Sequence, residues 1–200
     1  MKKRISEVRR KTKETDISIK LNLDGTGKSG IATGIPFLNH MLELFAKHGL
    51  FDLIVKAKGD LEVDRHHTNE DIALLLGEAF KKALGDKKGI ERFGSIAVPM
   101  DEVLAKVEVA LDISGRPKLV FNRMHGESSS AGVDYNISDV EHFLESFVNA
   151  SGITLHVETK GGRDFHHTAE AVFKALGVVL RMAVKINPRI KGVPSTKGRL

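Results

Sequence analysis

The chain contains no cysteine and no tryptophan, and tyrosine occurs only once. Without cysteine, disulfide bonds and thiolate metal sites are excluded, and we expect a cytoplasmic protein. No run of about 18 apolar residues occurs, so we expect no membrane span. The basic segment Met1–Arg4 is not followed by an apolar stretch, and we therefore expect no secretory signal.

The 200 residues carry a net charge of +5, and basic residues gather near both termini. A basic surface can bind nucleic acid or a phosphorylated small molecule. Aromatic residues are not interleaved with the basic ones, so stacking on single-stranded nucleic acid is poorly supported. We favour the small phosphorylated ligand and expect neither a nucleic-acid nor a membrane partner.

A five-residue pattern, His-His-Thr-X-Glu, occurs twice, at residues 66–70 and 166–170. Each copy opens an apolar run of helical periodicity. A histidine precedes each copy in similar helical sequence, His40 in one case and His142 in the other, and a strand-like run lies between. The repeated order of histidine, helix, strand and pattern indicates an internal duplication.

Alternation and periodicity predict the remaining elements. Pro36 is expected to open a helix, and Asp64 and Thr68 are candidate caps for the helix at the first pattern. The Ser-rich segment 126–132 is expected to be mobile. We expect strands at 16–23, 31–34, 51–58, 95–100, 103–112, 119–122 and 153–160, and helices at 37–48, 139–150 and from each pattern to residues 84 and 185.

The predicted fold class is α+β, built from two duplicated half-domains at residues 1–93 and 94–186 and a basic tail at 187–200. Each half-domain is expected to be a small mixed or antiparallel sheet with two helices on one face. This layout also occurs in ribosomal proteins. The helices of the two halves are expected to pack centrally, which would bring the two patterns toward each other or toward a neighbouring subunit.

The duplicated residues form two symmetric sets of candidate metal ligands. On a helix the first histidine and the glutamate of each pattern share a face, whereas the second histidine is rotated by about 100° and suits a different ion. Ligands of this type, without sulfur, suit Mn, Fe, Co, Ni or Zn, and we favour Mn because an octahedral ion keeps two open positions. The predicted sets are His40, His67, His166 and Glu170 for one ion, and His66, Glu70, His142 and His167 for the other.

Seven segments of the chain match the pattern of one known family. They are Gly34–Leu42, His48–Asp52, His66–Asp71, Asp112–Pro117, Val140–Phe143, His166–Ala171 and Pro194–Gly198. Taken together, these segments resemble the imidazoleglycerol-phosphate dehydratase family, and the resemblance covers nearly the whole chain. Asn39 and Arg65 depart from the family pattern at positions that flank candidate ligands, so they bear on the surroundings of the expected ions.

The resemblance implies a lyase that dehydrates D-erythro-imidazole glycerol phosphate to imidazole acetol phosphate in histidine biosynthesis. It also implies two Mn ions per subunit, no organic cofactor, and active sites between the subunits of a 24-subunit shell built from trimers. The family's ligand pattern falls on the two sets above, and Glu14 corresponds to its catalytic acid or base. Its substrate contacts fall on Glu14, His40, His48, His66, Glu70, Arg92, Arg116, His166, Lys174, Ser195 and Lys197.

A chemical account of this implied reaction starts from the imidazole ring of the substrate. If both ring nitrogens bind metal, the resulting imidazolate can expel the neighbouring hydroxyl through a diazafulvene-like intermediate. Arg92, Arg116 and Lys197, with the hydroxyl of Ser195, would hold the phosphate.

Two other functions compete with this one. A basic α+β nucleic-acid-binding module would bind generic RNA with a steep salt dependence and hold no metal. A two-metal hydrolase of phosphate esters would use bridging carboxylates, and none is evident in the sequence.

Overall fold

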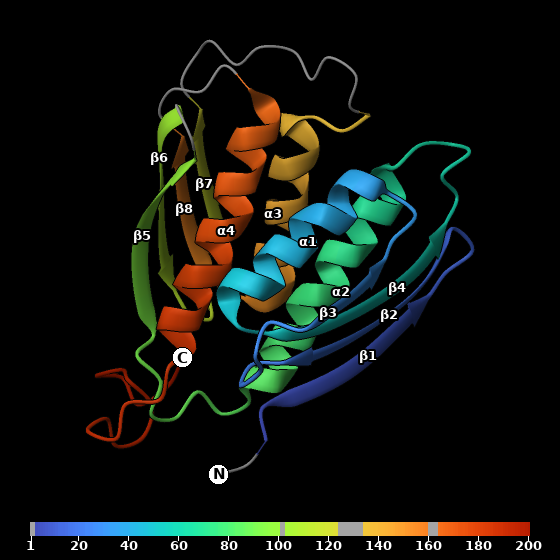
Figure 1. Ribbon diagram of the computed structural model, residues 1–200. Coiled ribbons are helices and arrows are strands. Elements are labelled where there is room, and N and C mark those ends of the chain that lie inside the picture. Colours follow the sequence, from blue (N-terminus) through green and yellow to red (C-terminus); the bar gives the residue numbers. More distant parts are fainter. Residues whose placement is uncertain (1–2, 101–102, 124–133, 160–163) are drawn as a thin grey trace.

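The structure, a computed structural model, describes residues 3–100, 103–123, 134–159 and 164–200, so the segment expected to be mobile lies outside the described residues. Within them the chain forms two four-stranded sheets with four helices packed between (Figure 1). None of these helices is both long and apolar enough to cross a lipid bilayer. In chain order the elements are β1 (Ile5–Lys11), β2 (Thr15–Asn22), β3 (Ser29–Ala32), α1 (Pro36–Gly49), β4 (Asp52–Gly59), α2 (His66–Leu84), β5 (Phe93–Met100), β6 (Val103–Asp112), β7 (Lys118–Arg123), α3 (Ile137–Ser151), β8 (Thr154–Thr159) and α4 (Phe165–Val184).

The two sheets have the same topology, as the duplication predicts. The strand order is β1-β2-β4-β3 in the first sheet and β5-β6-β8-β7 in the second. In each sheet the first three strands in this order pair antiparallel, and the last strand runs parallel to its neighbour. Both sheets are therefore mixed, and the predicted α+β class with duplicated halves and central helices is confirmed.

The sequence pattern explains β2 but not β1. In β2, Ile17, Ile19 and Leu21 are fully buried, and the alternating residues lie on the opposite face of the sheet. In β1 only Ser6 is buried, because this strand lies at the edge of the sheet. An edge strand with so little apolar burial has no clear period-two signal, so the sequence alone does not predict it.

Each five-residue pattern lies at the start of a helix, α2 in the first half and α4 in the second. The carboxylates of Asp64 and Asp164 each accept a hydrogen bond of 2.7 Å from the backbone N–H two residues later. These bonds satisfy a donor that the first helical turn leaves unpaired. Asp164 is the N-cap of α4, whereas in α2 the N-cap position is Arg65 and Asp64 accepts the bond from one residue further back. Thr68 is not a cap, because it lies inside α2 and is fully buried.

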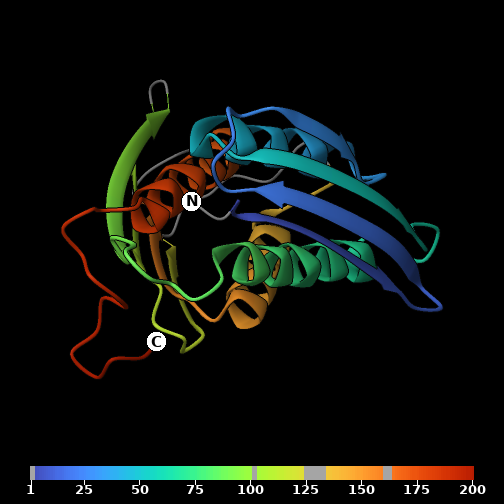
Figure 2. The same cartoon turned by 90° about the horizontal axis from the view of Figure 1, so that it is seen from below.

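Two helix pairs join the halves: α1 packs against α4, and α2 packs against α3 (Figure 2). A glycine stands at each crossing. A Cβ atom at Gly177 would lie only 2.5 Å from the carbonyl oxygen of Phe45, and one at Gly77 only 2.6 Å from that of Phe147. The missing side chain lets the two backbones of each pair approach closely.

These close approaches determine which ligand candidates meet. His40 precedes the α1–α4 contact by roughly one to two turns, and Glu170 does the same on the other helix. His142 and Glu70 stand at the matching positions of the α3–α2 pair. Each crossing therefore brings a histidine of one half to a glutamate of the other half.

Gly177→Ala and Gly77→Ala are each expected to destabilise the protein by about 1–3 kcal/mol, because the added methyl group would overlap backbone atoms. At an ordinary helical position the same change would stabilise by about 1 kcal/mol. Denaturant unfolding of each variant measures the effect. Glu78→Ala, at an exposed position of α2, is the control and should stay within about 0.5 kcal/mol of the parent. An alanine variant at position 77 or 177 as stable as the parent would show that the helices are not held at this distance.

Candidate metal centres

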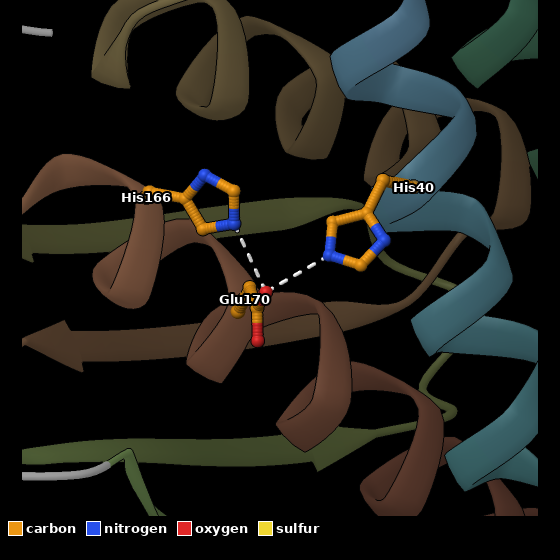
Figure 3. A group of neighbouring side chains, drawn as sticks. All are labelled: His40, His166 and Glu170. Carbon is orange, nitrogen blue, oxygen red and sulfur yellow. Dashed lines mark hydrogen bonds and ion pairs between the residues drawn. The ribbon is translucent and has the colours of Figure 1, made fainter.

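The first cluster joins α1 to α4. The Nε2 atoms of His40 and His166 lie 2.9 and 3.0 Å from the same carboxylate oxygen of Glu170 (Figure 3). Lys174, one turn further along α4, donates to the other oxygen at 2.6 Å. Burial alone would raise the pKa of Glu170, but the hydrogen bonds from Lys174, His40 and His166 lower this pKa to about 2. The carboxylate is therefore ionised at neutral pH and available as a ligand.

The second cluster joins α2 to α3 and contains the same residue types. The Oε2 atom of Glu70 lies 3.8 Å from Nε2 of His66 and 4.0 Å from Nε2 of His142. The two imidazole rings are stacked, with their centroids 4.3 Å apart. The Glu70 side chain is 40% exposed, whereas the Glu170 side chain is 10% exposed. The second cluster is thus the looser and more open of the two.

The donor set of each cluster fits a metal ion. In each cluster one nitrogen or oxygen per residue can be chosen so that these atoms all lie within 4.8 Å of one another. Two imidazoles and a carboxylate, with no sulfur, suit a divalent first-row transition metal. Each cluster takes residues from both halves of the chain, which is the division predicted from the duplication.

The remaining predicted ligands, His67 and His167, do not join these clusters within the chain. Their rings are nearly perpendicular to those of the histidines before them, with centroid separations of 6.1 and 6.2 Å. This is the consequence of the rotation between neighbouring positions on a helix. The Nδ1 atom of His67 lies 3.0 Å from Asp60, and this hydrogen bond raises the pKa of His67.

Glu14 lies exposed in the turn between β1 and β2, where its backbone N–H donates to the hydroxyl of Thr12 at 3.1 Å. After the hydrogen bond that His67 donates to Asp60, the negative charge of Glu14 is one of the smaller causes that raise the pKa of His67. The predicted acid or base therefore stands near His67, and it is not a member of either three-residue cluster of its own chain.

Two of the predicted phosphate-binding residues, Arg92 and Arg116, lie beside Asp112 at the end of β6. The guanidinium of Arg92 donates to both Asp112 oxygens, at 2.7 and 3.2 Å, and to the carbonyl oxygen of Pro194 at 2.9 Å. A guanidinium nitrogen of Arg116 lies 3.9 Å from the same carboxylate. Pro194 directly precedes Ser195, so the C-terminal tail reaches this group of residues.

The other predicted substrate contacts fall near the first cluster or in the tail. His48 lies in the last turn of α1, and its pKa is lowered by burial and then by the positive charges of Lys174 and Arg181. Lys197 is exposed, and its backbone N–H donates to the hydroxyl of Ser195 at 3.2 Å.

Two carboxylates of these surroundings were not singled out from the sequence, Asp60 beside His67 and Asp112 between two arginines. Asp112 carried a usable signal, because antiparallel pairing of the strands expected at 95–100 and 103–112 would place it close to Arg92. Asp60 carried none, because only the folded loop after β4 brings it to His67.

The two departures from the family pattern are accommodated beside the clusters. Asn39 accepts hydrogen bonds from the N–H and the hydroxyl of Thr33, at 2.9 and 2.6 Å, and so holds the turn into α1. Arg65 pairs with Asp134 and, at 3.0 Å, with Asp139 near the start of α3. Its positive charge is therefore compensated by acidic groups.

Comparison with known proteins connects this geometry to one family. A family model described as imidazoleglycerol-phosphate dehydratase matches residues 33–180. Curated relatives with that name include one from Thermoanaerobacter pseudethanolicus, 56% identical over 197 residues, which cover 98% of this chain and 100% of the relative. A chloroplastic relative from Pisum sativum is 53% identical over 198 residues, covering 98% of this chain and 69% of the relative.

Solved structures of the same kind are similar over the whole fold. The structure from Pyrococcus furiosus has a TM-score of 0.82 and 36% sequence identity, covering 96% of this chain and 100% of that chain. The structure from Staphylococcus aureus has a TM-score of 0.79 and 34% identity, covering 92% and 99%. Sequence and fold therefore agree across both halves of the chain.

Proposed function

The chain belongs to the imidazoleglycerol-phosphate dehydratase family of lyases, which acts in histidine biosynthesis, and we propose that it converts D-erythro-imidazole glycerol phosphate to imidazole acetol phosphate. The observation that carries this proposal is the pair of clusters of two imidazoles and one carboxylate, each assembled from both halves of the chain. The substrate offers a complementary group, an imidazole ring with two nitrogens that could each face one centre.

The proposed cofactors are two Mn ions per subunit. His40, His166 and Glu170 would hold one ion, and His66, Glu70 and His142 the other. When bound, the ions would supply positive charge that favours the anionic form of the substrate ring. No residue belongs to both clusters, so the described residues offer no bridging carboxylate of the kind a two-metal phosphoesterase uses.

The fourth ligand of each centre is proposed to come from another copy of the chain. His67 would complete the first centre of a neighbouring subunit, and His167 the second centre. Their positions outside the clusters of their own chain support this arrangement. Glu14 stands near His67, so it would reach the same neighbouring site. Active sites would then form only on self-association, in the 24-subunit shell of trimers that the family resemblance implies.

The chain's own residues would do three things in the reaction. Glu14 would move a proton on or off the reacting carbon or the leaving hydroxyl. Arg92, Arg116, Ser195 and Lys197 would hold the phosphate, which orients the reacting end of the substrate. Loss of the hydroxyl would then proceed through a diazafulvene-like intermediate of the substrate.

Turnover of imidazole glycerol phosphate by the assembled protein tests the proposed function. We expect imidazole acetol phosphate to form with Mn²⁺ present, no turnover after chelation, and recovery when Mn²⁺ is restored. Elemental analysis should show two Mn per chain. Release of inorganic phosphate from a generic ester would instead support a hydrolase, and absence of metal-dependent turnover would end the proposal.

A further inference from the structure

The two candidate metal centres differ at one position beside the carboxylate ligand. Lys174 stands one helical turn after Glu170, and its ammonium group lies 2.6 Å from that carboxylate. In the first half of the chain the matching position, one turn after Glu70, is Leu74. The duplication is therefore broken at a position that adds a positive charge to one centre only.

The surroundings of the two carboxylates increase this difference. The Lys174 side chain is 16% exposed and that of Glu170 is 10% exposed, so little water screens the pair. Glu70 is far more exposed, and its two histidine contacts are longer, at 3.8 and 4.0 Å. The Glu170 carboxylate is thus already paired with the ammonium group of Lys174. Leu74, at the matching position, offers Glu70 no charged partner.

We infer that the two metal centres are inequivalent, and that Lys174 makes the Glu170 centre the weaker and more readily exchanged of the two. The inference rests on the proposed pair of ions. A divalent cation at this centre would share its carboxylate with Lys174, which repels the cation and withdraws negative charge from the ligand. The Glu70 centre would fill first, and occupancy of the Glu170 centre would follow the free Mn²⁺ concentration.

Two features act in the opposite direction. His40 and His166 already converge on Glu170, so the first centre needs less rearrangement. Asp60 holds the ring of His67, the ligand proposed to complete this centre from a neighbouring subunit, and such a partner strengthens an imidazole ligand. The first effect adds no charge to the centre, and the charge of Asp60 reaches the ion only through the ring of His67. The ammonium acts directly on a doubly charged ion in a poorly screened site, and we expect its effect to be larger.

A reciprocal exchange of the two side chains tests the inference. Metal-free assembled protein would be titrated with Mn²⁺, and free Mn²⁺ followed by electron paramagnetic resonance. The parent should bind two Mn per chain in two phases, separated by about tenfold or more in affinity. Lys174→Leu should tighten the weaker phase about tenfold, and Leu74→Lys should weaken the tighter phase by a similar factor.

Two further variants assign the phases and control for charge. His40→Ala should remove the weaker phase and leave the tighter one. Lys20→Leu makes the same change as Lys174→Leu on an exposed position of β2, and it should leave both phases unchanged. If Lys174→Leu does not assemble, Lys174→Met takes its place.

Three results would each overturn the inference. The parent could bind its two Mn with equal affinity, Lys174→Leu could weaken the weaker phase further, or His40→Ala could lose the tighter phase. In all three cases two bound Mn per chain would leave the proposed function standing. Failure of the parent to bind Mn²⁺ would instead remove both.

Discussion

Glu14→Gln is expected to lower kcat by about 10²–10⁴-fold while the protein keeps both Mn ions. The amide has nearly the shape of the carboxylate, but it cannot take up or release the proton. Metal binding should persist because Glu14 lies in the turn between β1 and β2, outside both ligand clusters of its chain. Steady-state kinetics on imidazole glycerol phosphate and metal analysis of the same sample measure the two quantities.

Glu7→Gln is the matched control for this prediction. Glu7 is exposed on β1 in the same hairpin, so the variant carries the same change of charge and should retain the parent's kcat. Near-normal turnover of Glu14→Gln would remove Glu14 from the mechanism. Loss of Mn from that variant would show that Glu14 supports the metal centre instead of transferring a proton.

Mixed assemblies of two inactive variants are expected to regain activity when one variant supplies an intact cluster and the other supplies an intact His67. His166→Ala removes a ligand from a chain's own cluster, and His67→Ala removes the ligand proposed to be given to a neighbour. Each variant alone should lose at least about 100-fold in activity. In a random mixture about a quarter of the first centres would pair an intact cluster with an intact donor, so activity should rise to about a quarter of the parent value.

The control mixture combines His166→Ala with His40→Ala. Both changes lie in the same cluster of one chain, so no arrangement of the subunits rebuilds a complete first centre. This mixture should stay inactive under the same co-refolding and assay conditions. Recovery in the control mixture, or none in the mixture that contains His67→Ala, would show that His67 does not complete the centre of another subunit.

Much of the fold could be read from local pattern. The buried alternation in β2 and the apolar runs after the two His-His-Thr-X-Glu patterns predicted their elements to within a few residues. The predicted division of candidate ligands between two clusters also followed from local geometry, because adjacent helical positions point in different directions. Edge strand β1 was missed, since its exposed residues show no such alternation.

The sequence predicted less of the candidate site where the site depends on contacts between distant segments. No local pattern pairs Asp60 with His67, because only the folded loop after β4 brings these two groups together. Arg92 meets Asp112 for a different reason, because the antiparallel pairing of β5 with β6 places Asp112 opposite Phe93. The exposure of Glu70 and the burial of Glu170 could not be predicted from the pattern they share. Both depend on what packs around each helix.

The sequence by itself determined the duplication, the two types of candidate ligand and the prediction that neighbouring histidines face different sites, because each of these depends only on residue identity and helical spacing. Only the tertiary structure decided that Gly77 and Gly177 allow α2 to meet α3 and α4 to meet α1. It also decided that Lys174 rests against one carboxylate ligand and that His67 and His167 stand outside the clusters of their own chain. Those facts depend on long-range packing, because side chains far apart in the sequence pack against one another and form ion pairs only in the folded chain.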